Sequence, residues 1–431
     1  MIHAAVKWSK AAAAAARART AVRLGPTTFV GRNLRSLRLI HGDSNALNAN
    51  PVATQMINYA LSHARSQKSD ESYAQGMLVL EQCLSNQSND DQLAQDSKGM
   101  VLLAMSDLLC ERGNSDEAIE RLKQITCLKE SSFSTRVVAV EALVGLHIQS
   151  GQDEASSAIA EEFLELLKNE EPKIGPENFQ ALIARAKAIK GLSELVKGSI
   201  ESAASLFRGL ENHESCQGNV ALSYGEFFHA TGNYEMAKEM YQKAIKGTTE
   251  NKYSSGSCNM NSQETSLAAT FALGQLQSHV GNFADAEETL TSAVTKAEEY
   301  FGHRHQKVGV ILTGIALMYR KKAKQERSSS FLIQEGLYRR SLELMKAPPL
   351  DSEGYYSTET NMGTNDAAAL ARGGYAELLC IQENRKSEGE KMKAWAYSAW
   401  RNRRLSLSEA LNLSEPSGRV PILDARTARI I

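Results

Sequence analysis

A repeated pair of helix-like stretches joined by a glycine turn constrains this chain more than any other feature. In HATGNYEMAKEMYQKAI (229–245), the Gly-Asn pair at 232–233 separates two such stretches, and Ala237, Tyr241 and Ala244 follow at spacings of four and three. That spacing places three side chains on one face of a helix. A Gly-Asn pair is a common helix-ending and turn signal. The segment therefore predicts two antiparallel helices that pack closely through small residues.

The same pattern recurs in LGQLQSHVGNFADAEETLTSAV (273–294), KGLSELVKGSIESAASLFRGL (190–210) and MSDLLCERGNSDEAIERLKQI (105–125). The expected small residues of the second helices are Ala74, Ala118, Ala155, Ala203, Ala237 and Ala286. Ala203 and Ala237 are 34 residues apart, which is a period of helical-hairpin arrays. Since one hairpin cannot bury its own apolar face, we expect the hairpins to stack.

These segments resemble tetratricopeptide repeats, and the resemblance is best over residues 184–345. Residues 297–323 are similar to the connector of kinesin-light-chain-like repeats, where a Gly and a His precede the next first helix; here they are Gly302 and His305. The resemblance implies an all-α fold, a right-handed superhelical solenoid of stacked antiparallel helical hairpins. It also implies a non-enzymatic protein that binds a protein partner in its concave groove.

The pattern also predicts how the chain is organised. Helical hairpins are expected at about 52–85, 92–130, 134–169, 177–210, 216–246, 264–299, 306–346 and 366–398. The expected divisions are a disordered transit peptide at 1–42, repeats at 43–346, a linker at 347–365, a last degenerate hairpin with a capping helix at 366–413, and a tail at 414–431.

Two segments outside the repeat pattern carry expectations of their own. Residues 247–263 are polar and rich in Gly, Ser and Asn, which predicts an exposed loop. Residues 391–413 favour one long helix, in which Met392, Trp395 and Ala399 would face the body and cap the array.

The first 42 residues predict a targeting sequence. They contain eight Lys and Arg residues and no acid, and the first acid is Asp43. This Arg-rich, acid-poor composition is typical of a mitochondrial transit peptide. A chloroplast peptide and a basic arm that binds nucleic acid are the alternatives. Removing these cations from a chain of net charge −1 leaves about −9, which argues against general binding to DNA or RNA backbones.

The sequence contains no recognisable catalytic motif. It has no phosphate-binding loop, dinucleotide glycine pattern, metalloprotease helix or nucleophile elbow. His303 and His305 could ligate a metal, but no third ligand is near them in the sequence. The six cysteines are scattered, which favours free, mostly buried thiols. We therefore expect no enzyme activity, metal, cofactor or transmembrane segment, although an active site assembled in space remains an alternative.

The resemblance assigns the partner groove to first-helix side chains that are not needed for packing. These are Arg185, Leu192, Asn219, Leu222, Glu226, His229, Phe271, Gln275, Ser278, Thr313 and Arg320, with Phe271 as an apolar anchor. The leading hypothesis is a mitochondrial scaffold or assembly factor. The alternative is an organellar RNA-binding helical-repeat protein. A basic cluster at 401–404 could add a contact with an acidic partner or a membrane surface.

Overall fold

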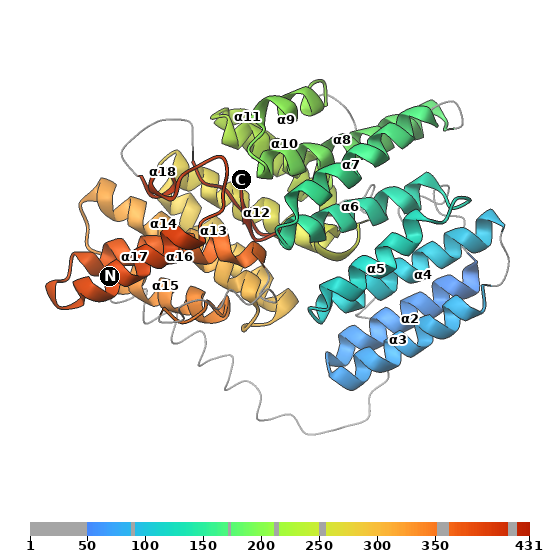
Figure 1. The fold of residues 1–431 in the computed structure, drawn as a ribbon, viewed down its shortest axis with the longest axis horizontal. Coiled ribbons are helices and arrows are strands. Elements are labelled where there is room, and N and C mark those ends of the chain that lie inside the picture. Colours follow the sequence, from blue (N-terminus) through green and yellow to red (C-terminus); the bar gives the residue numbers. More distant parts are fainter. Residues whose placement is uncertain are drawn as a thin grey trace. The chain divides into compact units, whose positions relative to one another are not determined.

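The computed structural model describes residues 50–87, 91–170, 174–210, 215–249, 256–350, 362–412 and 420–431. The expected transit peptide at 1–42 lies outside the described residues, as does most of the expected linker at 347–365. The described chain is almost entirely helical, and consecutive helices pack against each other in antiparallel pairs (Figure 1). The predicted all-α solenoid of helical hairpins is therefore confirmed.

Eight helix pairs follow one another along the described chain. They are α2 (Pro51–Gln67) with α3 (Asp70–Ser85), α4 (Gln92–Glu111) with α5 (Ser115–Thr126), α6 (Phe133–Gln149) with α7 (Asp153–Asn169), α8 (Pro176–Val196) with α9 (Ile200–Phe207), α10 (Gly218–Ala230) with α11 (Tyr234–Thr249), α12 (Ser262–His279) with α13 (Phe283–Phe301), α14 (Gln306–Glu326) with α15 (Phe331–Leu344), and α16 (Met362–Cys380) with α17 (Lys386–Ala399).

Glycines with positive φ make the turns inside five of the hairpins. They are Gly113, Gly151, Gly198, Gly232 and Gly281, with φ between 73° and 91°. Residues other than glycine pay a steric penalty in this left-handed region. The turn at Gly232 is closed by the Asn233 amide, which donates to the Phe228 carbonyl at 2.9 Å. The Gly-Asn signal in the sequence therefore corresponds to a defined helix-ending turn.

Small residues allow the two helices of a hairpin to approach closely. A Cβ atom placed on Gly225 would lie 2.7 Å from the ring of Tyr241, and one on Gly191 would lie 2.5 Å from the ring of Phe207. Ala237, on the helix that carries Tyr241, is completely buried. The small–large–small spacing in the sequence thus reflects direct packing between paired helices.

Two of the alanines expected at this packing position do not occupy it. Ala74 and Ala155 are exposed, whereas Gly76 of α3 and Ser156 of α7 are buried against the neighbouring helices. The Ser156 hydroxyl lies 2.8 Å from that of Ser193 on α8. In these two hairpins the packing position is held by a different small residue, so the alanine spacing assigned the wrong face.

Residues 257–260, in the segment expected as an exposed loop, are buried. Residues 258–260 form the short 3₁₀ helix η3 (Cys258–Met260), whose side chains are at most 3% exposed. The Cys258 amide and the Ser257 hydroxyl donate to the Asp107 carboxylate at 2.6 and 2.7 Å. Because distant helices satisfy these polar groups, a Ser- and Asn-rich segment packs inside the protein.

The single helix expected over 391–413 is also wrong. Helix α17 ends at Ala399, Trp400 is extended, and a separate short helix, α18 (Leu407–Leu411), follows. Asp366 accepts the amide of Arg401 at 3.0 Å, and Ser406 and Glu409 form a capping box that starts α18. The interruption lets the chain turn back toward the helices that precede it.

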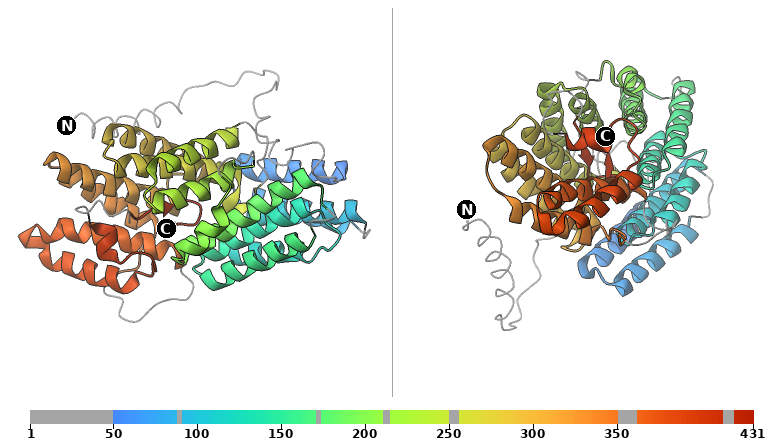
Figure 2. Two further views of the ribbon diagram at one scale, coloured as in Figure 1. Left: turned by 90° about the horizontal axis from the view of Figure 1, so that it is seen from above. Right: turned by 60° about the vertical axis from the view of Figure 1, so that its left-hand side comes forward.

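The last described residues form a small β-hairpin on the inner side of the helix array. Strands β1 (Leu423–Asp424) and β2 (Arg429–Ile430) are antiparallel, with Leu423 opposite Ile430. They contact α12 and α16, respectively. Figure 2 (right) shows this end of the chain surrounded by the curve of helices. A tail without repeat character is therefore part of the protein interior.

Candidate functional site

The inner side of the helix array is the strongest candidate for a functional site. We define the inner groove by the helices that residues 420–431, the C-terminal segment, contact: α6, α10, α12 and α16 together with the start of α7. First helices such as α6, α10 and α12 are buried along most of their length. Their remaining polar side chains are therefore available to face whatever fills the groove.

Arg426 is the central contact between the C-terminal segment and the groove. Its side chain is 0% exposed and forms an ion pair with Glu226 of α10. It also donates to Asn219 at 3.2 Å and to Ser223 at 3.3 Å. Within the segment, Asp424 accepts the Arg426 Nε–H at 3.1 Å. Burial raises the pKa of Glu226, and the nearby guanidinium opposes that rise.

Arg429 makes the second charged contact. Its two terminal nitrogens bind the two carboxylate oxygens of Asp153 at 2.9 and 3.1 Å. One of them also donates to the Ile148 carbonyl at 3.0 Å, and Nε lies 3.3 Å from Asp366. Burial raises the pKa of Asp366, whereas Arg429 lowers it. The C-terminal segment therefore places two arginines among three carboxylates of the groove.

The backbone of the C-terminal segment is also bound by side chains. The Gln275 amide group donates to the Leu423 carbonyl and accepts the Leu423 N–H, both at 2.9 Å. Asn402 donates to the Ile430 carbonyl at 2.5 Å, and Arg404 donates to the main-chain oxygen of Ile431 at 2.7 Å. A side chain that pairs with both backbone groups of one residue acts on an extended peptide much as a neighbouring strand does.

Three of the eleven predicted groove residues contact the C-terminal segment directly: Asn219, Glu226 and Gln275. Arg185 instead pairs with Glu141 of α6, with Nε–Oε1 at 2.8 Å. Arg320 pairs with Glu377 and donates to the Leu411 carbonyl at 2.8 Å.

The six remaining predicted residues belong to the packed interior and are at most 5% exposed: Leu192, Leu222, His229, Phe271, Ser278 and Thr313. Phe271 is 0% exposed, and its ring fills the space beside Gly314 on α14. The expected exposed apolar anchor is therefore wrong, because a glycine on the next first helix receives the ring. His229 lies 2.7 Å from His279 and 3.1 Å from the Tyr241 hydroxyl. Burial lowers the pKa of both histidines, to about 3 for His279.

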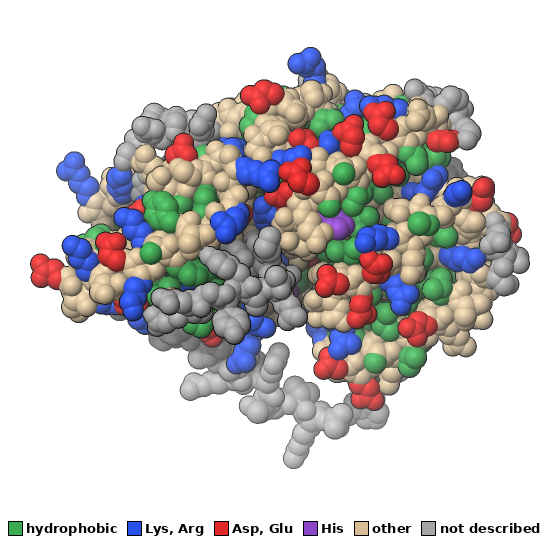
Figure 3. Space-filling model, in the orientation of Figure 1, with side chains coloured by type: hydrophobic (Ala, Val, Ile, Leu, Met, Phe, Trp, Pro, Cys, Tyr) green, Lys and Arg blue, Asp and Glu red, His purple; other side chains and the backbone are tan. Residues whose placement is uncertain are grey.

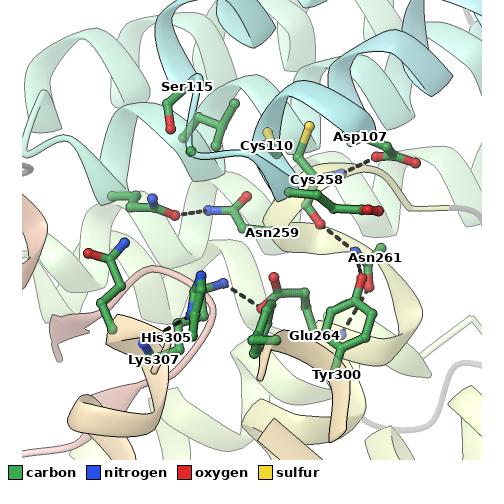
Figure 4. A pocket seen from close by; sticks show the side chains of 16 residues that line it. Asp107, Cys110, Ser115, Cys258, Asn259, Asn261, Glu264, Tyr300, His305 and Lys307 are labelled. Carbon is green, nitrogen blue, oxygen red and sulfur yellow. Dashed lines mark hydrogen bonds and ion pairs between the residues drawn. The ribbon is translucent and has the colours of Figure 1, made fainter. Parts of the chain in front are cut away.

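A polar cavity of about 70 Å³ lies between the early and central hairpins. Figure 4 shows Cys110 and Asp107 of α4 facing Cys258 of η3, with Glu264 of α12 and Lys307 of α14 at the opposite wall. Lys307 and Glu264 form a buried ion pair at 2.5 Å. Chain segments that are far apart in the sequence therefore meet at this cavity.

Three of the titratable groups that line the cavity have raised pKa values because they are buried. Burial raises the pKa of Asp107, of Cys258 and of Glu264, the last to about 7. A thiol with a raised pKa is a poor nucleophile and a poor metal ligand at neutral pH. The hydrogen bonds from Asn259 to Gln149 and from Asn261 to the Cys258 carbonyl join the walls. We interpret the cavity as a polar joint between hairpins.

Within the described residues, no group of three or more His, Cys, Asp or Glu side chains is arranged to hold a metal ion. None of the helices in that part of the chain combines the length and apolar character needed to cross a bilayer. Comparisons with protein-family models and with curated proteins give no match to this chain.

The repeat pattern gave no indication of the C-terminal segment. Its signal was nevertheless present: the aliphatic pairs Ile422-Leu423 and Ile430-Ile431 flank a short polar stretch that begins with Asp424. Two apolar pairs around a turn-forming residue are typical of a hairpin with a buried face. The contacts of Arg426 and Arg429 with the groove could not be predicted from the sequence, because their carboxylate partners on the helices lie more than 60 positions away.

Proposed function

We propose that this chain is a protein-binding scaffold or assembly factor whose inner groove holds a segment of a partner protein. One observation carries the proposal: the groove is already complementary to a peptide. It binds the C-terminal segment through backbone contacts from Gln275 and through carboxylates that pair with Arg426 and Arg429. Stacked helical hairpins create extended concave surfaces that suit this kind of binding.

The charge of the groove supports a peptide rather than RNA as its occupant. Glu226, Asp153 and Asp366 face the C-terminal segment, and carboxylates at these positions would repel a phosphate backbone. On the face drawn in Figure 3, Lys and Arg side chains alternate with Asp and Glu among the described residues. Nucleic-acid-binding domains instead gather basic side chains into a patch or stripe.

Mitochondria are the proposed location of this activity. The proposal rests on residues 1–42, whose eight cations and lack of acids are typical of a mitochondrial transit peptide. Affinity purification of the full chain from mitochondria tests the proposed scaffold function at this location. An internal tag between Ser328 and Ser329 suits this purpose, because both residues are exposed whereas Ile431 is buried.

The expected result is one protein recovered in a near-stoichiometric amount that resists nuclease treatment. A chain carrying a tag of opposite charge at the same site serves as the control for nonspecific capture. Two results would contradict the proposal. In the first, the recovered proteins are all lost when the RNA that is purified with them is digested. In the second, no protein is recovered at a constant ratio to the bait.

A further inference from the structure

The C-terminal segment is a self-contained hairpin. The backbones of Ile422 and Ile431 exchange two hydrogen bonds, at 3.1 and 2.8 Å, and the Ala428 amide donates to the Asp424 carbonyl at 2.8 Å. Asp424 also accepts the amide of Arg426 at 2.9 Å and the Thr427 hydroxyl at 3.0 Å. These bonds lie within the segment itself, and they fix the shape of the turn that the groove holds.

The groove contacts this hairpin at two charged positions. Arg426 and Arg429 are three residues apart, yet they reach different helices: Arg426 meets α10, whereas Arg429 meets α7 and α16. The guanidinium of Arg429 binds Asp153 through two parallel hydrogen bonds, a geometry that lysine cannot reproduce. The groove therefore recognises two arginines with two residues between them, in a hairpin flanked by aliphatic side chains.

We propose that the groove is a peptide site specific for such an arginine hairpin, and that the C-terminal segment occupies it as an internal competitor of a partner segment of the same chemistry. This inference rests on the proposed function and names its partner: a protein with an exposed hairpin that carries Arg-x-x-Arg between aliphatic residues. The backbone contacts of Gln275 are independent of sequence, so specificity comes from the arginine pair and the flanking aliphatic residues.

Covalent linkage gives the internal segment a large advantage. Residues 413–419 join α18 to the segment, and a short tether of this kind corresponds to an effective concentration on the order of 1 mM. A free partner of equal affinity at about 1 µM would then fill only about one groove in a thousand. A partner must therefore bind more tightly, make further contacts, or act after the segment has been released.

The test cuts the tether but leaves the segment in the groove. A site for a sequence-specific protease replaces residues 413–419 of the full chain, and the probe is the peptide VPILDARTARII (420–431) with a fluorescent label at its amino end. After cleavage, we expect the labelled peptide to exchange with the original segment. Before cleavage, we expect no binding at micromolar peptide.

Variant peptides test the specificity. Arg426→Ala removes one member of a buried, hydrogen-bonded charge pair, so the peptide should bind at least about 30-fold more weakly. Val420→Ala shortens a partly buried side chain at the edge of the segment and should bind within about threefold of the parent. Equal binding of the two variants would overturn the assignment of specificity to the arginine pair.

Two further outcomes would overturn the inference. If the cleaved protein keeps its original segment and excludes the probe, or loses its helical circular dichroism signal when the segment leaves, the segment is a permanent part of the core. If a protein partner is recovered from mitochondria but the peptide does not exchange, the inference about the groove is overturned, and the scaffold function stands with its binding site on another face. Exchange without any recovered protein would overturn the proposed function and leave the groove specificity standing.

Discussion

Replacing Arg426 by methionine tests how strongly the C-terminal segment is held. The arginine and its partner Glu226 have side chains that are 0% and 1% exposed. Methionine keeps much of the buried volume but removes the cation. Breaking a buried ion pair by removing one partner destabilises a protein by about 3–5 kcal/mol, because the other charge stays buried and unpaired.

The carboxyl of Glu226 can avoid that penalty only by taking up a proton. Burial already raises its pKa, and the variant lacks the guanidinium that opposes the rise. Protonating a carboxyl with an ordinary pKa of 4.5 costs about 3.4 kcal/mol at pH 7 and about 0.7 kcal/mol at pH 5. The folded variant binds one proton more than its unfolded state in this range, so its stability rises as the pH falls.

We therefore expect Arg426→Met to lose about 3–5 kcal/mol of unfolding free energy relative to the wild type at pH 7. Between pH 7 and pH 5 it should gain up to about 2.7 kcal/mol relative to the double variant Arg426→Met/Glu226→Gln, which lacks this carboxyl. Urea-induced unfolding followed by circular dichroism at both pH values measures this. Both variants keep Asp424, the other carboxylate that pairs with Arg426, so the comparison between them isolates the proton taken up by Glu226.

Arg403 provides a matched control. Its side chain is 57% exposed and pairs with Glu154, which is 69% exposed, so Arg403→Met should cost less than about 1 kcal/mol. A loss for Arg426→Met as small as this at pH 7 would refute the buried ion pair as the anchor of the segment.

Three further predictions concern the helix pairs, the buried histidines and the amino-terminal region. Gly225→Ala should lower the unfolding free energy by about 1–3 kcal/mol, because its Cβ would lie 2.7 Å from an aromatic ring. Gly336→Ala has no atom within 4 Å of its Cβ and should raise the unfolding free energy by up to about 1 kcal/mol. Equal melting temperatures for the two variants would exclude close packing at Gly225. His229 and His279 stay neutral in the folded protein, so acidification from pH 6.5 to pH 5 should remove about 2 kcal/mol of stability for each histidine that remains neutral. His279→Gln should reduce this dependence of the unfolding free energy on pH, measured by urea titration at each pH. An unchanged pH dependence would contradict a buried neutral pair. Residues 1–42 fused to a fluorescent reporter should direct it to mitochondria, and replacing their arginines by glutamine should abolish import; delivery to plastids would contradict this assignment.

The hairpin architecture could be predicted from the sequence because its determinants are local. Gly232 supplies a positive φ at a turn, and Gly225 and Tyr241 meet across one hairpin. Each of these features lies within one repeat and recurs in its neighbours. Periodicity therefore identified the helix pairs even where individual alanines, such as Ala74, were placed on the wrong face.

The contents of the groove could not be predicted, because they depend on contacts between distant parts of the chain. Arg426 and Glu226 are 200 residues apart, and Ser257 and Asp107 are 150 residues apart. A polar or non-periodic segment has the same composition whether it is exposed or satisfied by distant partners. For this reason residues 247–263 are expected as an exposed loop and residues 414–431 only as a tail, although residues 257–260 and 422–431 are buried.

Hydrogen exchange of the full chain, alone and bound to the protein recovered from mitochondria, tests the central claim most directly. The amides of Ile422, Ala428 and Ile431 are hydrogen-bonded within the C-terminal hairpin, and that of Leu423 is bonded to Gln275. If the partner occupies the inner groove, binding should speed deuterium uptake by residues 422–431 while α10 and α12 stay protected. Uptake by the segment that is unchanged in the stoichiometric complex would contradict a partner site in the groove.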